Sequence, residues 1–487
     1  MITFLISLAA LVLGYLVYGR FVERIFVPDD RVTPAVAQAD GLDYVAMPYW
    51  KVFMIQFLNI AGTGPIFGAI MGAKFGPAAY LWIIFGCIFA GAVHDYFVGM
   101  LSMRNGGCDL PELVRRYLGG AASKVLLVFA VFLLIMLGTV FVYSPAEILH
   151  GISGSTTMWI TIIFIYYVVA TMLPIDKIIG KIYPLFSFSL LFMAVALMAV
   201  LFVKWPALPE LWDGVGNMGK AADPASFTDN IFPCLFITIA CGAISGFHAT
   251  QSPLMARCLT SERKGRPIFY GALSTEGLVA LVWATVSMWF FYDAPQPGYA
   301  QIGGTVANGL HTSAPVVVNL VCKDWLGIVG GVLAMLGVVA APITSGDTAF
   351  RSARLIIAQA LKLSQRAKKN RLYICVPLFA ASFAMLVWQM ENPDGFNTIW
   401  QYFGWANQTL SVFALWTITV YLVRERKPYV ITLVPALFMT CVCTTFFMVS
   451  KTALGLPYTV GYGVGATALV VAAVWFVVWM KKSNCKG

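Results

Sequence analysis

Long apolar runs constrain this chain more than any other feature of its sequence. A membrane-spanning helix needs about 20 mostly apolar residues, and by that measure the sequence predicts about thirteen spans. The predicted spans are Ile2–Gly19, Val52–Met71, Pro77–Leu101, Val125–Val142, Met158–Leu173, Ile182–Val203, Ile231–Ser252, Ile268–Phe291, Trp325–Ile343, Leu372–Met390, Ile399–Val423, Val430–Val449 and Tyr462–Met480. The sequence therefore predicts an all-α protein embedded in a lipid bilayer.

The composition excludes the soluble classes. Of the 487 residues 60% are hydrophobic and 11% are charged, whereas roughly a quarter are charged in soluble domains. The net charge of +10 comes from basic residues that separate apolar runs without interleaved aromatic residues, which excludes nucleic acid as a partner. The cysteines fall mostly inside apolar runs with no CxxC pair, so we interpret them as small core residues rather than metal or redox ligands.

The basic residues also predict the orientation. All but five of the 32 Lys and Arg residues lie in alternate connections between the spans, and the other set of connections holds only Lys74, Lys204, Lys220, Lys323 and Lys451. Because cytoplasmic loops collect Lys and Arg, this bias predicts an outer N-terminus and a cytoplasmic C-terminus. An odd number of spans agrees with that topology.

Two of the predicted spans contain residues that break helices. The first reads NIAGTGPIFG from Asn59 to Gly68, and the second reads CGAISGFHATQSP from Cys241 to Pro253. Unwound backbone at membrane depth is tolerated only where protein or a water-filled cavity satisfies its polar groups, since each unpaired group in lipid costs several kcal/mol. Glycine for close helix packing is the alternative, but two such clusters favour a shared polar cavity.

The spacing of the two breaks predicts an inverted repeat. Four uninterrupted spans lie between them, so each break begins a unit of five helices, and an odd unit enters the membrane from the opposite side the second time. The predicted organisation is an extra helix and loop in 1–50, a first repeat in 51–204, a second in 205–423 and two further helices in 424–487. The outer connections Lys204–Asn230 and Tyr292–Asp324 are either partial helices over a vestibule or ordinary loops.

Few ionisable groups lie inside the spans, and such groups face a cavity or pair with one another. Asp95 is either functional or part of an ion pair between helices. His94 is interpreted as structural, and Glu276 as a polar anchor between helices. His248 lies inside the second break, which favours a role in substrate binding or gating.

The polar stretch APITSGDTAFRSAR, from Ala341 to Arg354, stands at the end of a predicted span. Thr344 and Ser345 offer hydroxyl oxygens and Asp347 a carboxylate, which are the hard ligands that Na⁺ prefers. Asp347 can instead bind a proton. Alternatively, Ser345 to Asp347 cap the end of the helix, with Arg351 and Arg354 as topology charges.

Five blocks carry a resemblance to a known family. FLNIAGTGPIFGAIMGAKFGP, GAVHDYFVGMLSMRNGG, CGAISGFHATQSP, SGDTAFRSAR and FGWANQTL are similar to blocks of the carbon starvation protein A family of bacterial inner-membrane carriers. The resemblance implies a LeuT-like 5+5 inverted repeat of the amino acid–polyamine–organocation superfamily and uptake of peptides during carbon starvation, or of pyruvate with protons. It also implies a sodium position where Thr344 and Ser345 approach the carbonyls around Ala61 and Gly62.

The sequence therefore predicts secondary active uptake of a small carboxylate-bearing metabolite by alternating access. The predicted substrate-binding residues are Asn59, Gly62, Thr63, Gly64, Ser245, Gly246, His248, Gln251 and Asn407, although Asn407 is also explained as a hydrogen-bonding residue between helices. The predicted ion-coupling residues are Ala61, Thr344, Ser345, Asp347 and Asp95. No cofactor is predicted beyond Na⁺ or H⁺, and the sequence sets no oligomeric state.

Two other classes compete with a carrier. A membrane-embedded enzyme would need a nucleophile–base pair or a metal cluster, and HExxH and GxSxG are both absent from the sequence. A nutrient sensor would bind the same molecule without moving it, and only flux measurements separate it from a carrier.

Overall fold

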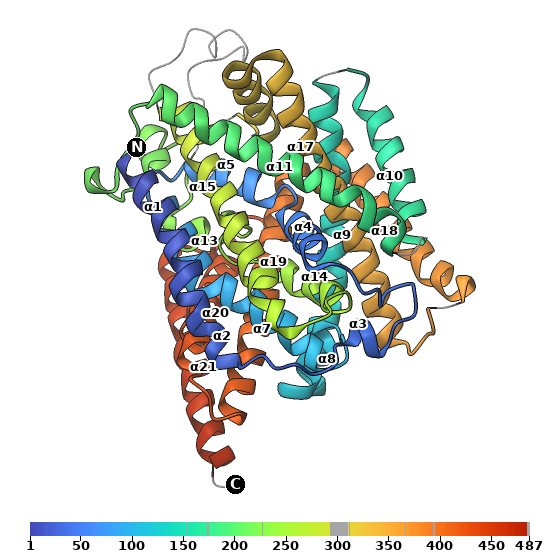
Figure 1. Cartoon of the computed structure of the whole chain (residues 1–487). Helices are drawn as coiled ribbons and strands as arrows, with labels where there is room; N and C mark the ends of the chain where they lie inside the picture. Colours follow the sequence, from blue (N-terminus) through green and yellow to red (C-terminus); the bar gives the residue numbers. More distant parts are fainter. Residues whose placement is uncertain are drawn as a thin grey trace.

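The structure, a computed structural model, describes the chain except residues 152, 173–174, 226, 293–309, 311, 366, 393–394 and 485–487. The regular secondary structure of the described part is helical apart from one isolated bridge between Met47 and Leu259. Helices of the apolar runs lie side by side, and polar loops gather at the two ends of the bundle (Figure 1). This architecture confirms the all-α prediction.

The apolar runs form helices because a helix satisfies its own backbone hydrogen bonds inside lipid. In chain order these helices and their one-turn extensions are α1 (Ile2–Leu13), η1 (Gly14–Tyr18), α2 (Gly19–Phe26), α4 (Tyr49–Ala61), η2 (Gly64–Gly68), α5 (Ala69–Ala73), α6 (Ala78–Phe85), η3 (Gly86–Gly91), α7 (Ala92–Arg104), α9 (Gly120–His150), α10 (Thr156–Met172), α11 (Ile175–Lys204), η5 (Ile231–Leu235), α13 (Phe236–Thr238), α14 (Gly246–Ala256), η7 (Arg266–Tyr270), α15 (Gly271–Tyr292), α17 (Ala314–Ala360), α18 (Lys368–Glu391), α19 (Gly395–Arg424), α20 (Val430–Val449) and α21 (Tyr458–Asn484). Two short helices, α3 (Pro34–Ala37) and α8 (Leu110–Tyr117), lie in connections between these helices.

Helices occupy all the predicted spans, but the count of thirteen is not confirmed. Ten described helices are long and apolar enough to cross a membrane, and the bent pair of α4 with η2 and α5 makes an eleventh. The two remaining predictions correspond to α10, which has 17 residues, and to the interrupted segment from η5 to α14. Both fail the test of length because one is short and the other is divided by its break.

Both predicted interruptions are present in the structure. The first separates α4 from η2 and α5, whose axes differ by 48°. The second leaves residues 239–245 without regular helix between α13 and α14. The halves of the broken helices pack at the centre of the bundle, where α4 and α14 contact each other and both contact α17.

One predicted boundary is wrong. The span predicted to end at Ile343 continues as α17 to Ala360, with a single non-helical residue, Gly327, near its start. Thr344, Ser345 and Asp347 therefore lie inside a helix, and the alternative in which they cap its end is excluded. Hydropathy placed the boundary too early because the stretch of α17 from Thr344 to Arg354 is rich in polar residues that are nevertheless buried.

The connections between repeats are partly described. Residues between Lys204 and Asn230 contain two short helices, η4 (Leu211–Asp213) and α12 (Met218–Ala222). The prediction for Tyr292–Asp324 falls largely outside the described residues. In Figure 1 the chain begins in the upper part of the bundle and ends at the bottom beside α21, as expected for an odd number of crossings. The side that faces the cytoplasm and the repeat boundaries stay predictions.

Candidate functional site: the two helix breaks

The first break is built from glycine and proline. Gly62 has a φ of 41° and ends α4, a conformation that side chains with a Cβ rarely adopt. Pro65 follows two positions after Thr63 and has no N–H to continue the helical ladder. The break is therefore a property of these few residues, which are all buried.

Polar side chains at the first break lack partners. Both polar atoms of the Asn59 amide and the hydroxyl oxygen of Thr63 are buried and have no hydrogen-bond partner among the described residues. Buried polar groups in native proteins are almost always paired, so an exception calls for an explanation such as a bound water, ion or ligand. Among the predicted site residues, Asn59 and Thr63 are therefore the best suited to bind a substrate or an ion.

The second break is held by Asn407 of α19. Its Oδ1 accepts hydrogen bonds from the Phe247 backbone N–H at 2.6 Å and from the Ser245 hydroxyl at 3.0 Å. Asn407 thus caps the N-terminus of α14, where the first N–H groups have no partner in their own helix. A Cβ on Gly246 would lie 2.2 Å from the Asn407 carbonyl oxygen, so glycine permits this close approach.

The two breaks touch each other. A Cβ on Gly64 would lie 2.3 Å from the Sγ of Cys241, so the backbone of the first break packs directly on the second. A cavity of about 10 Å³ remains beside this contact, lined by Gly64, Cys241, Trp400 and other residues of α13 and α19. That volume is close to one water molecule, so a larger guest requires the helices to separate.

The structure places the predicted ion-coupling residues in different surroundings. Ser345 lies beside the first broken helix, but its hydroxyl donates to the Leu58 carbonyl at 3.0 Å and the Asn59 carbonyl at 2.9 Å rather than to the carbonyls of Ala61 and Gly62. Ala61 is buried at the end of the same helix. Thr344 instead donates to carbonyls of its own helix, including that of Ala341.

Asp347 is buried beside α11. The hydroxyl of Tyr183 donates to its Oδ2 at 2.8 Å, and its Oδ1 has no hydrogen-bond partner among the described residues. Arg351 and Arg354, predicted as topology charges, are buried as well, and both lie near Asp43 at 3.8 and 3.5 Å.

Asp95 lies in a separate cluster of buried side chains. Its Oδ1 lies 2.7 Å from His94 Nδ1 and its Oδ2 lies 2.9 Å from His248 Nδ1. The Nε2 of His248 faces the Glu276 carboxylate at 3.5 Å. All four side chains are fully buried, so the predicted coupling residue and the predicted substrate residue form one cluster between α7, α14 and α15.

Gln251 links α14 to α17. Its Nε2 donates to Ser352 Oγ at 3.2 Å, while its Oε1 has no partner among the described residues.

Three contributors were missed by sequence reasoning. Glu276 was interpreted as an anchor and Cys241 as a core residue, yet their donor atoms lie with the His248 imidazole within 4.8 Å of one another. Nothing in the sequence pointed to Tyr183, whose hydroxyl donates to Asp347. A break that contains both Cys241 and His248 was the one available sign, because unwound backbone can turn both side chains to one side.

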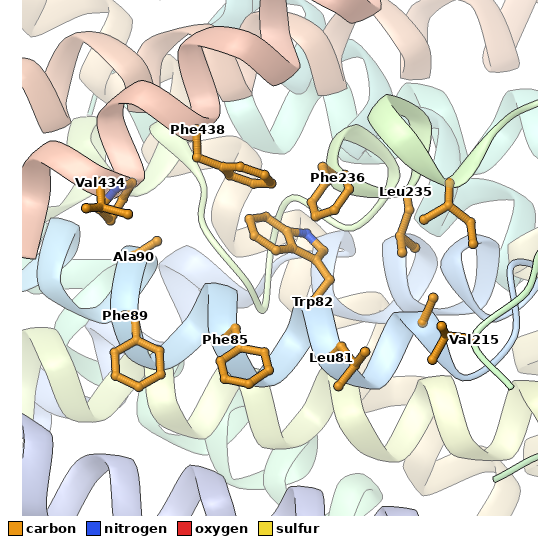
Figure 2. Close-up of a pocket in the computed structure, with 13 residues that line it drawn as sticks. Leu81, Trp82, Phe85, Phe89, Ala90, Val215, Leu235, Phe236, Val434 and Phe438 are labelled. Atoms are coloured by element: carbon orange, nitrogen blue, oxygen red, sulfur yellow. The ribbon is translucent and has the colours of Figure 1, made fainter. Parts of the chain in front are cut away.

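A larger pocket lies elsewhere. This groove of about 550 Å³ is lined almost entirely by apolar side chains of α6, η3, η5, α13 and α20, with Trp82 between Phe236 and Phe438 (Figure 2). The Trp82 indole N–H connects this groove to the second break by donating to the Ile239 carbonyl at 2.8 Å. An apolar groove of this kind has no groups that would bind a carboxylate.

The comparisons with known proteins agree with this arrangement of helices. The family model described as "Carbon starvation protein CstA" matches residues 1–153, 142–314 and 303–446. Among solved structures, a manganese transporter from Eremococcus coleocola has a TM-score of 0.57 at 12% identity and covers 91% of this chain and 99% of its own. The amino-acid-bound transporter MhsT has a TM-score of 0.55 at 12% identity, covering 86% and 98%.

Similar sequences include three proteins from two bacterial species. An uncharacterized membrane protein of Haemophilus influenzae is 44% identical over 61% of this chain and 92% of its own length. The peptide transporter CstA of Escherichia coli is 26% identical over 90% and 79%, and the pyruvate/proton symporter BtsT of the same species is 28% identical over 69% and 56%. With a LeuT-like fold containing two discontinuous helices, this transporter chain belongs to the carbon starvation protein CstA family.

Proposed function

We propose that the chain imports a small carboxylate-bearing nutrient, pyruvate or a peptide, across the bacterial inner membrane by alternating access. The observation that carries the proposal is the contact of two broken helices in the bundle centre, with buried polar atoms of Asn59 and Thr63 that have no partner among the described residues. The names of the relatives support this substrate class, and the family name supports import during carbon limitation.

We assign the carboxylate of the substrate to the first break. The N-terminus of a helix carries a partial positive charge and exposed N–H groups. At the second break, Asn407 already occupies this position on α14, and His248 lies between the carboxylates of Asp95 and Glu276. Two nearby carboxylates would repel an anion, so Asn59 and Thr63 are the better candidates for its first contacts.

We further propose that the coupling ion is a proton bound by Asp347. An ionisable residue within the membrane is expensive and is by default a functional candidate. The sodium alternative would need the hydroxyls of Thr344 and Ser345, and these donate to backbone carbonyls instead, Thr344 to Ala341 and Ser345 to Leu58 and Asn59. The printed name of the BtsT symporter supports a proton as well.

The test is uptake into proteoliposomes. Radiolabelled pyruvate and a dipeptide are offered under an imposed pH gradient or sodium gradient, and the accumulated compound is identified by chromatography. We expect Thr63→Val to raise KM about 10-fold or more, since a hydrogen bond to a charged group contributes about 1.5–3 kcal/mol.

The matched control is Thr417→Val, because the Thr417 hydroxyl is equally buried and donates within its own helix to Phe413. Equal uptake by both variants would move the substrate away from the first break. Binding without accumulation in the wild type would instead identify a sensor.

A further inference from the structure

A set of metal-binding side chains meets at the second break. The Sγ of Cys241, the imidazole of His248 and a carboxylate oxygen of Glu276 lie within 4.8 Å of one another, and all three residues are buried. They come from the unwound segment, from α14 and from α15, so the fold and not the sequence brings them together. We propose that Cys241, His248 and Glu276 form a binding site for Zn²⁺ or a similar transition-metal ion.

The orientation of His248 supports the proposal. Its Nδ1 is held at 2.9 Å by Asp95, whose other oxygen is held at 2.7 Å by His94. A histidine that binds a metal almost always has its second ring nitrogen fixed by a carboxylate or carbonyl. Asp95 thus leaves Nε2 free to face Glu276 and Cys241.

Most of the binding atoms also lack a hydrogen-bond partner among the described residues. Nε2 of His248 and both carboxylate oxygens of Glu276 are buried and have no hydrogen-bond partner among the described residues. The Sγ of Cys241 makes a long contact of 3.6 Å with the Ser245 hydroxyl and lies close to the His248 imidazole. A buried carboxylate needs a compensating charge or hydrogen bond, and a bound cation would supply it.

The three donor atoms, one sulfur, one nitrogen and one oxygen, indicate which metal ion the site would prefer. A thiolate, an imidazole and a carboxylate suit Zn²⁺ or Co²⁺, whereas Mg²⁺, Ca²⁺ and Mn²⁺ prefer oxygen ligands. Three protein ligands leave a fourth position open, as in zinc sites that bind water or substrate. The small cavity next to Cys241 has room for such a water molecule.

A metal at this site would stop transport if the proposed function holds. It would tie the unwound segment and α14 to α15 and so fix the second break, which must move in alternating access. Zn²⁺ would therefore inhibit uptake. This consequence rests on the proposed function, but metal binding does not.

The test begins with metal binding to the purified protein in detergent. After treatment with a chelator, the protein is titrated with Co²⁺, and we expect a thiolate-to-cobalt absorption band that Zn²⁺ abolishes. Cys241→Ser removes the band, and His248→Gln and Glu276→Gln weaken Co²⁺ affinity by 10-fold or more. Asp95→Asn weakens it about 10–100-fold through the orientation of the imidazole.

Cys87→Ser is the matched control, because Cys87 is a buried neighbour whose Sγ instead faces the Leu273 carbonyl. Should a variant fail to fold, X-ray absorption of the zinc-loaded wild type decides, with one sulfur and lighter nitrogen or oxygen ligands expected. A wild type without the band, or a band retained in Cys241→Ser, overturns the site.

Failure of the two proposals can be told apart. Proton-driven uptake without metal binding refutes the metal site alone. Metal binding without uptake of pyruvate or peptide refutes the proposed function alone.

Discussion

Glycine is what allows the two breaks of this transporter to touch their neighbours. A Cβ on Gly91 would lie 2.0 Å from the Ala243 carbonyl oxygen, and one on Gly64 would overlap Cys241. Real Cβ atoms do not approach so closely, so these glycines fix how near the unwound segment comes to the adjacent helices. The general preference for small residues between membrane helices acts here at the level of single atoms.

We expect Gly91→Ala to destabilise the protein by about 1–3 kcal/mol, because the contact is with backbone and the helices must move apart. Thermal unfolding in detergent measures the change. Gly463→Ala is the control, since nothing lies within 4 Å of a Cβ there. Equal midpoints for the two variants would contradict the packing argument.

Asp347 offers a second test by a single substitution. If it carries the coupling proton, Asp347→Asn abolishes accumulation driven by a pH gradient, while exchange of labelled for unlabelled substrate across the membrane continues. Asp30→Asn, which alters an exposed pair with Arg263, leaves both processes unchanged. Retained pH-driven accumulation in Asp347→Asn would place the proton elsewhere.

The secondary-structure elements depend on caps supplied by distant helices. The N-terminus of α14 stands in the middle of the bundle, where water is scarce, and its free N–H groups need a partner from the protein. Asn407 supplies that partner from α19. Ser345 of α17 has a similar role at the end of α4, where its hydroxyl donates to the Leu58 and Asn59 carbonyls.

Asn407→Ala removes the cap and should cost about 0.5–2 kcal/mol. Because the loss is local, amides of the first turn of α14 should exchange hydrogen faster, as followed by mass spectrometry. Thr417→Val lies on the same helix and bonds only within it, so it should leave the exchange of α14 unaltered. An unchanged rate in Asn407→Ala would mean that water or another group caps the helix.

At the scale of the whole molecule, the segment before α4 covers one end of the helix bundle, the end predicted to face the cytoplasm. Asp43 lies near Arg351 and Arg354 of α17, and the Met47 N–H donates to the Cys258 carbonyl at 3.1 Å. Arg257 pairs with Asp109 at 2.6 Å. These contacts cover the C-terminal parts of α14 and α17 and must break if the site opens toward that end.

We expect Asp43→Asn to favour the inward-open form. Cys258 reports this change, because it is fully buried and burial raises the pKa of its thiol to about 12. The thiol stays protonated at neutral pH until the segment moves, so its alkylation, followed by mass spectrometry, should become several-fold faster. Asp30→Asn, in the same segment but in an exposed pair, should alkylate at the wild-type rate; the same rate in Asp43→Asn would show that this segment does not close the site.

The sequence by itself determined the membrane class, the positions of the helices and both breaks. These features are local: twenty apolar residues require a helix in lipid, and a run of glycines with a proline, such as Gly62, Gly64 and Pro65, favours a break. The approach of Ser345 to the first broken helix was predicted as well, but only through resemblance to a known family. The count of crossings was less secure, since α10 is short and α14 begins after a break.

Only the tertiary structure decided which polar groups meet. Asp95 and His248 are 153 residues apart, and Ser345 is 287 residues from Leu58. Charge and hydropathy do not show which face of a buried helix a side chain occupies. From the sequence, Glu276 was therefore interpreted as an anchor between helices and Cys241 as a core residue. Their meeting with His248 depends on the path of the unwound backbone at the second break, which is set by close packing against α7, α15 and α19.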